Sequence, residues 1–302
     1  MDKEFIKSPL NYTGGKYKIL DQIIPLFPEG IDTFVDLFAG GFNVGINVTA
    51  KKVIYNDIVD YLIDLFYKFR ENDIEATLRH IKNRIKEFAL SKTNEEGYKK
   101  LRDYYNKHRH PLDLYVLICY SFNYQIRFNN SHEYNNSFGR NRSSFNPRLE
   151  KRLAKFIKRL KKKKVEFKNQ DFVNFDINAL NKEDFVYCDP PYLISTGSYN
   201  DGKRGFKGWR EKEERELLDL LNEFNNKNIK FALSNVLKHK GKTNNILSNW
   251  SKNYNVIDIN KDYKNCNYQA KNNKECVTKE VLITNYEVKR SVLPGEQLKM
   301  SI

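Results

Sequence analysis

The stretch Phe185-Val186-Tyr187-Cys188-Asp189-Pro190-Pro191-Tyr192 decides the fold that the sequence predicts. Its first four residues are apolar and strand-forming, and the two prolines after Asp189 can continue neither a helix nor a strand ladder. The stretch therefore predicts a buried strand that ends in a rigid turn. Asp189 and Tyr192 would stand at the carboxyl end of that strand, which is the edge where open α/β sheets bind ligands.

The side chains at this strand end suit a planar ring that carries an exocyclic amine. The Asp189 carboxylate and the Pro190 carbonyl can accept the two amine hydrogens, while the Tyr192 side chain stacks on the planar ring. The alternative is an ordinary strand-to-loop turn with a capping aspartate. On the first interpretation, the candidate catalytic residues are Asp189, Pro190, Pro191 and Tyr192.

A second strand-turn pattern lies earlier, at Thr33-Phe34-Val35-Asp36-Leu37-Phe38-Ala39-Gly40-Gly41-Phe42-Asn43-Val44-Gly45. It predicts a buried strand, a glycine-rich bend that makes room for a cofactor, and the start of a helix. Val53-Ile54-Tyr55-Asn56-Asp57 follows as a second strand that ends in a carboxylate. An acidic residue about 20 positions after the glycines is well placed to accept from ribose hydroxyls. Nicotinamide binding is less favoured, because Gly-x-Gly-x-x-Gly is absent.

Near the amino terminus, Asn11-Tyr12-Thr13-Gly14-Gly15-Lys16 precedes a helical pattern of apolar residues over 19–24. Paired glycines let the backbone approach a ligand closely, and the amino end of a helix favours a negative group. Taken alone, these residues also fit a plain turn.

Together these motifs resemble those of the α-group adenine-N6 DNA methyltransferases, the Dam-like family. The resemblance covers nearly the whole chain and implies a Rossmann-like, S-adenosylmethionine-dependent methyltransferase sheet of the α/β class. It also implies an inserted, mainly helical target-recognition domain that bears a β-hairpin. The activity implied is transfer of a methyl group from S-adenosylmethionine to N6 of a flipped adenine in duplex DNA.

The resemblance also assigns residues to the cofactor, S-adenosyl-L-methionine. Asp36 and Phe38 match the methionine side, Asp57 matches the ribose carboxylate, and Asp171 matches the residue that meets the adenine amine. The full expected set is Tyr12, Gly14, Gly15, Lys16, Asp36, Phe38, Gly40, Asp57, Asp171, Phe172 and Asp189.

The sequence departs from the family pattern in two places. The glycines of Phe38-Ala39-Gly40-Gly41-Phe42 are adjacent, whereas the family commonly has Phe-x-Gly-x-Gly. Tyr12 stands where the best-known members carry tryptophan, which suggests a different branch and a different target sequence.

The middle of the chain predicts a helical insertion. From Ile58 to about Tyr120, apolar residues recur at spacings of three and four, and Pro111 suits the first position of a helix. Asn146-Pro147 predicts the capped start of another helix. We expect a catalytic domain over residues 1–60 and 165–302 and a target-recognition domain over 61–164.

Arginine, asparagine and aromatic residues alternate within this insertion, and a turn-rich centre over 129–136 predicts a hairpin at about 122–146. Arginine reads guanine, asparagine or glutamine reads adenine, and a finger of this kind can fill the gap left by an extruded base. The candidate DNA-binding residues are Asn123, Gln125, Arg127, Asn129, Arg140 and Arg142. The alternative is a flexible polar loop. The run Lys161 to Lys164 is typical of a solvated helix face, and beside the hairpin it would also track phosphates.

Composition supports a nucleic-acid partner. Lysine plus arginine number 53 against 38 aspartate plus glutamate, a net charge of +15, which indicates a polyanionic partner. The alternative is a generally basic proteome. The family resemblance implies that the partner is double-stranded DNA. The four cysteines contain no Cys-x-x-Cys pair, so we expect no metal site, no disulfide framework and a cytoplasmic protein with reduced thiols. The first ten residues lack a signal-peptide core, and no apolar run approaches the ~20 residues of a membrane span.

Three other functions remain as alternatives. Cytosine-N4 methylation more often uses serine at the first catalytic position, and methylation of RNA or of protein glutamine usually uses asparagine, so Asp189 favours adenine. A DNA-binding protein without catalysis fits the charge but needs no cofactor pocket. The sequence leaves open the target site, a cognate restriction endonuclease or a phage origin, and whether the protein is a monomer or a weak dimer.

Overall fold

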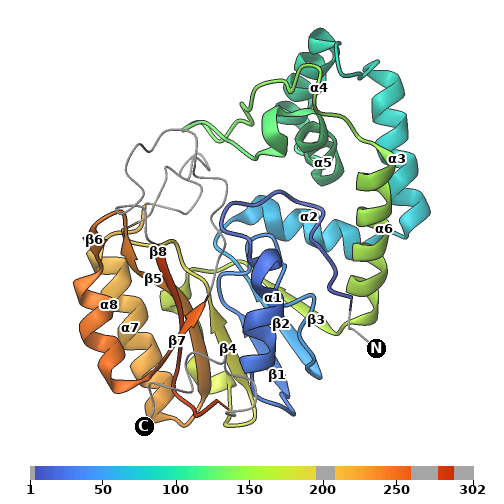
Figure 1. Cartoon of the computed structure of the whole chain (residues 1–302). Coiled ribbons are helices and arrows are strands. Elements are labelled where there is room, and N and C mark those ends of the chain that lie inside the picture. The colour runs from blue at the N-terminus through green and yellow to red at the C-terminus, as the bar shows by residue number, and fades with distance from the viewer. Residues whose placement is uncertain (1–3, 195–207, 260–277, 289–302) are drawn as a thin grey trace.

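The computed structural model describes residues 4–194, 208–259 and 278–288. Within these residues, eight strands form one sheet, in the order β3-β2-β1-β4-β5-β8-β7 with β6 paired to β5 (Figure 1). β1 to β5 pair with one another in parallel, whereas β6, β7 and β8 pair antiparallel. The strands are β1 (Thr33–Asp36), β2 (Lys52–Asn56), β3 (Val165–Lys168), β4 (Phe185–Cys188), β5 (Lys230–His239), β6 (Lys242–Thr243), β7 (Asn255–Ile259) and β8 (Thr278–Thr284).

Helices cover both faces of the sheet. The α-helices are α1 (Leu20–Ile23), α2 (Asp60–Glu71), α3 (Ile74–Glu87), α4 (Glu95–His108), α5 (Pro111–Tyr120), α6 (Pro147–Lys162), α7 (Glu211–Asn226) and α8 (Asn245–Trp250). The 3-10 helices are η1 (Lys16–Ile19), η2 (Ile24–Leu26), η3 (Phe122–Tyr124), η4 (Phe172–Asn174), η5 (Ile177–Ala179) and η6 (Ser251–Asn253). No helix in the described part of the chain is long and apolar enough to cross a membrane.

The strands bury residues on both faces, as continuous apolar strands in a covered parallel sheet should. Phe185 and Tyr187 join the apolar cluster that includes α1 and α2, whereas Val186 and Cys188 join the cluster that includes α7. This alternation follows from the two-residue period of a strand. The predicted strand and its bounds are therefore confirmed, and the α/β class with a mostly parallel sheet is confirmed with them.

The order of the strands creates a crevice between β1 and β4. From β1 the chain moves outward through β2 and β3, and from β4 it moves outward the other way through β5. Asp36 closes β1 and pairs in register with Tyr187 of β4, and Asp189 follows two residues later. Open α/β sheets bind ligands where the strand order reverses in this way.

In the sequence, helices α2 to α6 lie between β2 and β3, and these two strands are direct neighbours in the sheet. The helices expected from Ile58 to Tyr120 and after Asn146 are all present. Pro111 opens α5, and the Asn146 side chain caps α6 by accepting from the backbone N–H groups of Arg148 and Leu149. In Figure 1, α3, α4 and α5 stand beyond the carboxyl edge of the sheet, whereas α2 lies against it. The domain boundaries at 60/61 and 164/165 stay a prediction, because α2 and the sheet share one apolar cluster.

Two predicted helices are wrong or interrupted. The glycine-rich bend after β1 leads into turns rather than a helix over residues 37–51. Phe42 adopts a left-handed φ of 58°, and the Asn43 side-chain Oδ1 accepts from the backbone N–H of Ser8, so a side chain holds this loop in a non-helical form. The helix expected over 19–24 is divided into η1, α1 and η2, where Pro25 lacks a backbone N–H.

A polar cluster joins α3 to α5. The Asp113 carboxylate is fully buried, and its Oδ1 lies 2.6 Å from His80 Nε2 and 2.9 Å from Arg84 Nε. Potential metal-ligating atoms of His80, His110 and Asp113 lie within 4.8 Å of one another. Because the Arg84 guanidinium already binds this carboxylate, the cluster fits a helix-helix ion pair better than a cation site.

Phe66 of α2 tests whether this helix belongs to the sheet's core. Its fully buried ring lies 5.3 Å from the Tyr55 ring of β2 and 5.5 Å from the Phe156 ring of α6. Phe66→Ala should lower the free energy of unfolding by about 3–5 kcal/mol, because it leaves a cavity among these rings. The neighbouring Tyr67 is 58% exposed, so Tyr67→Ala should cost less than about 1 kcal/mol. Urea unfolding of both variants measures this, and equal costs would contradict the shared core.

Candidate active site

One cavity of about 770 Å³ opens at the carboxyl ends of β1, β2 and β4. This volume lies in the range of small-molecule and cofactor pockets. Every residue expected at the catalytic or cofactor site lines it: Tyr12, Gly14, Gly15, Lys16, Asp36, Phe38, Gly40, Asp57, Asp171, Phe172, Asp189, Pro190, Pro191 and Tyr192. Five separate stretches of the chain, 12–16, 36–40, 57, 171–172 and 189–192, thus converge on a single site.

Asp57 and Gly40 form the part of the cavity wall contributed by the loops that follow β1 and β2. One Asp57 carboxylate oxygen accepts from the Gly40 backbone N–H at 2.7 Å, and the other accepts from Val59 N–H at 3.0 Å. Gly40 has a φ of +46°, and a Cβ there would lie 2.8 Å from the Tyr12 ring. Glycine is therefore required at position 40 by both backbone conformation and space.

Asp36 lies deeper in the same wall and is 2% exposed. Its Oδ2 accepts from the Gly45 backbone N–H at 2.9 Å. Burial raises the pKa of the Asp36 carboxyl to about 8, and the nearby charges of Asp189 and Asp57 act in the same direction. The cavity without a ligand therefore holds a protonated carboxyl group at neutral pH.

Three aromatic rings form another part of the wall. The Phe38 ring centroid lies 5.3 Å from that of Phe172 and 5.7 Å from that of Trp209. Trp209 donates its indole N–H to Glu214 at 2.6 Å, and this fully buried carboxylate also accepts from Asn244. These rings give the cavity an apolar region that suits the flat face of a purine.

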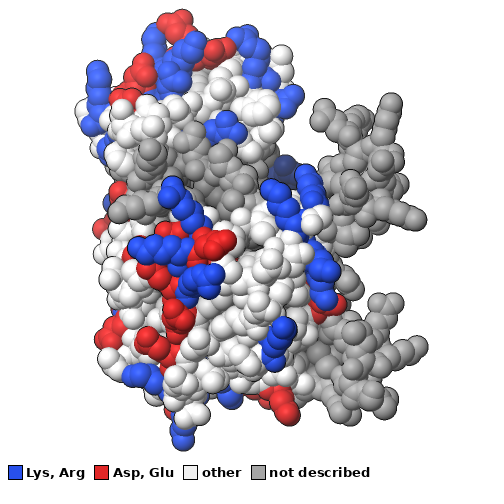
Figure 2. All heavy atoms as spheres, turned by 90° about the vertical axis from the view of Figure 1, so that its left-hand side faces the viewer, with Lys and Arg blue, Asp and Glu red and all other residues white. Residues whose placement is uncertain are grey.

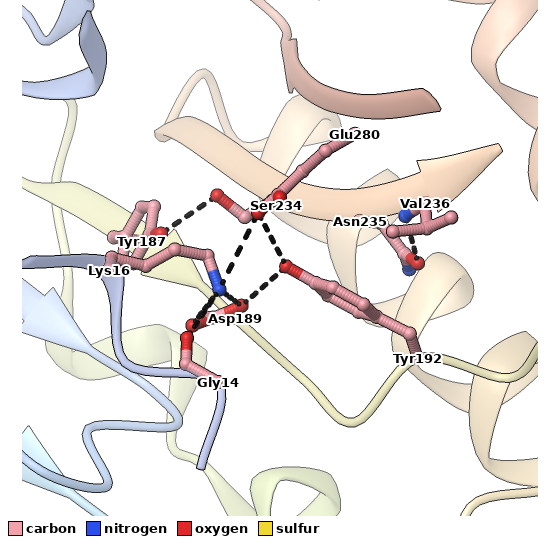
Figure 3. Close-up of polar contacts among 9 residues, drawn as sticks. All are labelled: Gly14, Lys16, Tyr187, Asp189, Tyr192, Ser234, Asn235, Val236 and Glu280. Carbon is pink, nitrogen blue, oxygen red and sulfur yellow. Dashed lines mark hydrogen bonds and ion pairs between the residues drawn. The ribbon is translucent and has the colours of Figure 1, made fainter. Parts of the chain in front are cut away.

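Lys16 and Asp189 form the most direct contact between the motifs (Figure 3). The buried Lys16 ammonium lies 2.6 Å from both Asp189 carboxylate oxygens and donates to the Gly14 carbonyl at 3.0 Å. The Tyr192 hydroxyl lies within hydrogen-bond distance of Asp189, at 3.1 Å, and of Glu280, at 3.2 Å. The candidate catalytic carboxylate is thus held by an ion pair and faces a second carboxylate.

Sequence reasoning missed three residues of this site. Trp209 and Glu280 were not singled out, although a lone acidic residue in the otherwise apolar stretch Glu280–Thr284 was a possible signal. The third is Asn56, which lines the cavity and donates from Nδ2 to the Leu37 carbonyl at 3.0 Å. Its buried Oδ1 has no hydrogen-bond partner among the described residues, so it can accept from a bound ligand.

Residues 12–287 match the model of the D12 class N6 adenine-specific DNA methyltransferases. The chain belongs to this family. It is 55% identical over 93% of its length to Type II methyltransferase M.FokI of Planomicrobium okeanokoites, and 50% identical over 95% to Modification methylase StsI of Streptococcus sanguinis. The chain spans 43% and 44% of those two proteins. A DNA adenine methylase of Salmonella typhi is 30% identical over 63% of the chain and 66% of that protein.

In this family member, the segment predicted to read DNA folds back on itself without regular strands. Antiparallel bridges join Ser121 to Phe138 and Phe128 to Tyr134, and each is isolated. The expected β-hairpin is therefore not confirmed as such. The segment rests on the first motif, because Asn11 donates to the backbone carbonyl of Asn123 at 2.9 Å.

The six candidate DNA-binding residues all lie outside the cavity lining. Arg127 and Asn123 are exposed, and Gln125 is half-buried. Asn129 donates to Glu133 within the segment, and Arg140 forms an ion pair with Glu95 of α4 at 2.5 Å. The Arg142 guanidinium stacks over the exposed Phe122 ring at 5.1 Å.

The lysine run does not lie beside this segment, so the second interpretation, in which it tracks phosphates there, loses its basis. α6 begins at Pro147, directly after the segment, and its 16 residues place Lys161 and Lys162 about 24 Å away along the axis. The run leads into β3 at Val165, so it lies at the amino edge of the sheet, opposite the cavity (Figure 1). Lys161 donates to the Arg70 carbonyl there, which fits a structural or solvated role.

The positive charge is spread rather than gathered on the face drawn in Figure 2. Lysine and arginine side chains occur on the upper, helical part and on the sheet part below, with acidic side chains among them. Net charge alone therefore does not locate a DNA interface on this face.

The raised pKa of Asp36 predicts how the stability of the folded protein changes with pH. Between its usual pKa of 3.8 and its raised value of about 8, the folded protein keeps a proton that the unfolded chain releases. Its contribution to stability is therefore largest below pH 4 and is lost as pH rises toward 8. Asp36→Asn should remove this contribution, so its melting temperature should fall less than that of the wild type between pH 5 and 8. Parallel slopes in thermal melts without ligand would contradict the raised pKa.

Proposed function

We propose that this chain transfers a methyl group from S-adenosyl-L-methionine to N6 of adenine in double-stranded DNA. The observation that supports this most is the convergence of Asp189-Pro190-Pro191-Tyr192 and the glycine-rich cofactor motifs on one cavity at the reversal of strand order. The family description, N6 adenine-specific, favours adenine over cytosine N4. A cavity of this size with paired carboxylates also disfavours a binding protein without catalysis.

The lining residues fit the parts of this cofactor. Asp36 suits the methionine ammonium, Asp57 suits the ribose hydroxyls, and the rings of Phe38, Phe172 and Trp209 suit the adenine face. Asp171, the N-cap of η4, lines the same cavity and suits the adenine amine. When bound, S-adenosylmethionine supplies an electrophilic methyl group on a sulfonium. The protein's own contribution is to position the acceptor amine and to exclude water.

The catalytic residues act on the target amine. Its lone pair is delocalised into the purine ring, and hydrogen bonds from the amine to Asp189 and to the Pro190 carbonyl favour localising it on nitrogen. Tyr192 stacks on the base and fixes its plane. Asp189 need not act as a strong base beforehand, because the amine becomes acidic once it carries the methyl group. Rate enhancement then comes mainly from orientation and electrostatics.

Target recognition is assigned to residues 61–164. The adenine must leave the duplex to reach the cavity, and the segment over 121–142 lies next to the first motif through Asn11. We assign base and backbone contacts to Asn123, Gln125, Arg127, Asn129, Arg140 and Arg142. The names of the relatives from Planomicrobium okeanokoites and Streptococcus sanguinis support a modification role, in which a restriction endonuclease would share the target site. We expect a monomer or a weak dimer.

Asp189→Ala tests the proposed function directly. Removal of the acceptor should lower the methyl-transfer rate far more than tenfold while the fold and DNA affinity are retained. Cofactor affinity should fall moderately, because Asp189 also lines the cofactor cavity. The assay is mass spectrometry of nucleosides from treated duplex DNA, which separates N6-methyladenine from N4-methylcytosine. Asp219→Ala is the control, because Asp219 is exposed on α7 and outside the cavity. An Asp189→Ala rate above a tenth of the wild-type rate, a loss under ~1.4 kcal/mol, would refute the role.

Substitution of Arg127 distinguishes contacts with base edges from contacts with the DNA phosphates. Once sequencing of modified DNA has located the target site, Arg127→Ala should weaken cognate binding by about 1–3 kcal/mol and relax discrimination at one base pair. Lys161→Ala with Lys162→Ala removes two charges at the opposite edge of the sheet, so DNA affinity should change little. Binding to cognate and scrambled duplexes at two salt concentrations measures both. Equal losses on both duplexes for Arg127→Ala would make the segment a phosphate clamp.

A further inference from the structure

Glu280 is a second carboxylate in the catalytic cluster, and it shares its donors with Asp189 (Figure 3). The Tyr192 hydroxyl lies 3.1 Å from Asp189 Oδ1 and 3.2 Å from Glu280 Oε1. The Lys16 ammonium lies 2.6 Å from Asp189 and 3.9 Å from Glu280. One cation and one hydroxyl thus stand between two carboxylates.

The tertiary fold brings Glu280 to this place from a distant strand. It lies on β8, where it pairs with Val236 of β5, and β5 is the neighbour of β4. Its side chain is 1% exposed. A buried carboxylate is costly unless cations or hydrogen-bond donors compensate it, so its place beside Lys16 and Tyr192 requires a reason.

The two donors cannot serve both carboxylates fully at once. A tyrosine hydroxyl has a single hydrogen, so Tyr192 can donate to Asp189 or to Glu280 but not strongly to both. Lys16 has three hydrogens, one of which is directed to the Gly14 carbonyl. In the structure Lys16 is close to both oxygens of Asp189, the atoms that the proposed function requires for the target amine.

We propose that Glu280 is a positioning residue that takes over Lys16 and Tyr192 when the target amine reaches Asp189. This inference rests on the proposed function. Movement of the ammonium by about 1 Å toward Glu280 brings it within hydrogen-bond distance of that carboxylate. The Tyr192 hydrogen changes acceptor by rotation of the hydroxyl. Asp189 then accepts from the amine without leaving a buried cation uncompensated.

Glu280→Gln tests this exchange, because it keeps the size of the side chain and an acceptor for Tyr192 but removes the charge that attracts Lys16. We expect the single-turnover rate of methyl transfer to fall at least tenfold. The melting temperature and the dissociation constants for S-adenosylmethionine and DNA should stay close to wild type. A loss of rate alone distinguishes positioning from a merely structural role.

A double-mutant cycle with Lys16→Met identifies the partner through which Glu280 acts. In the Lys16→Met background there is no ammonium to transfer, so Glu280→Gln should cause less than a twofold further loss. If Glu280→Gln fails to fold, Glu280→Asp should show the same selective loss of rate, because its shorter side chain withdraws the carboxylate from both donors.

Three results would overturn the inference while leaving the proposed function intact: a wild-type rate in Glu280→Gln, the same fractional loss with and without Lys16, or a loss explained by weaker cofactor binding. A wild-type chain that binds S-adenosylmethionine but transfers no methyl group to DNA would instead refute the proposed function.

Discussion

The ion pair between Lys16 and Asp189 joins the first motif to the last across 173 positions of sequence. The Lys16 side chain is buried and the Asp189 side chain is 17% exposed, so their contact at 2.6 Å persists only if the backbone holds both charges in place, since the buried ammonium alone would be costly. The parallel pairing of β1 with β4 meets this condition. It places the turn after β4 beside the loop after β1, and the segment before η1 closes over both.

Burial then gives similar carboxylates different properties within one cavity. Asp36 lies deepest, and its pKa is raised to about 8, so it is neutral at pH 7 until a cationic ligand favours its ionised form. Asp57 accepts two backbone N–H groups and shapes the Gly40 turn. Asp189 is held by a lysine, and Glu280 faces the same lysine from β8. The environment of each carboxylate, rather than its residue type, suits it to a separate task.

The helices between β2 and β3 contact the segments around this site, but none of their residues lines the cavity. α2 packs on the sheet through Phe66, while the segment after α5 reaches back to Asn11 beside the cavity. If the segment contacts DNA as proposed, a rearrangement there would reach the first motif through the Asn11–Asn123 hydrogen bond. The same contact explains how a polar segment with only isolated bridges is kept next to the sheet.

The sequence by itself determined many of the local elements and the motif residues that line the cavity, but not Trp209, Asn56 or Glu280. The run Phe185–Cys188 and its two prolines specified β4 and its end, Asn146 and Pro147 specified the start of α6, and the motif residues all reached one cavity. These features depend on backbone torsions, capping and the two-residue or 3.6-residue period of burial, which neighbouring residues encode.

Only the tertiary structure decided which distant side chains meet. It placed Glu280 beside Lys16, set Trp209 against Phe38, paired Arg140 with Glu95, and carried Lys161 to the edge opposite the cavity. It also held the loop after β1 in turns through Asn43 and Ser8. The physical reason is that strand register, helix length and packing set such distances, and no local pattern in the chain contains them.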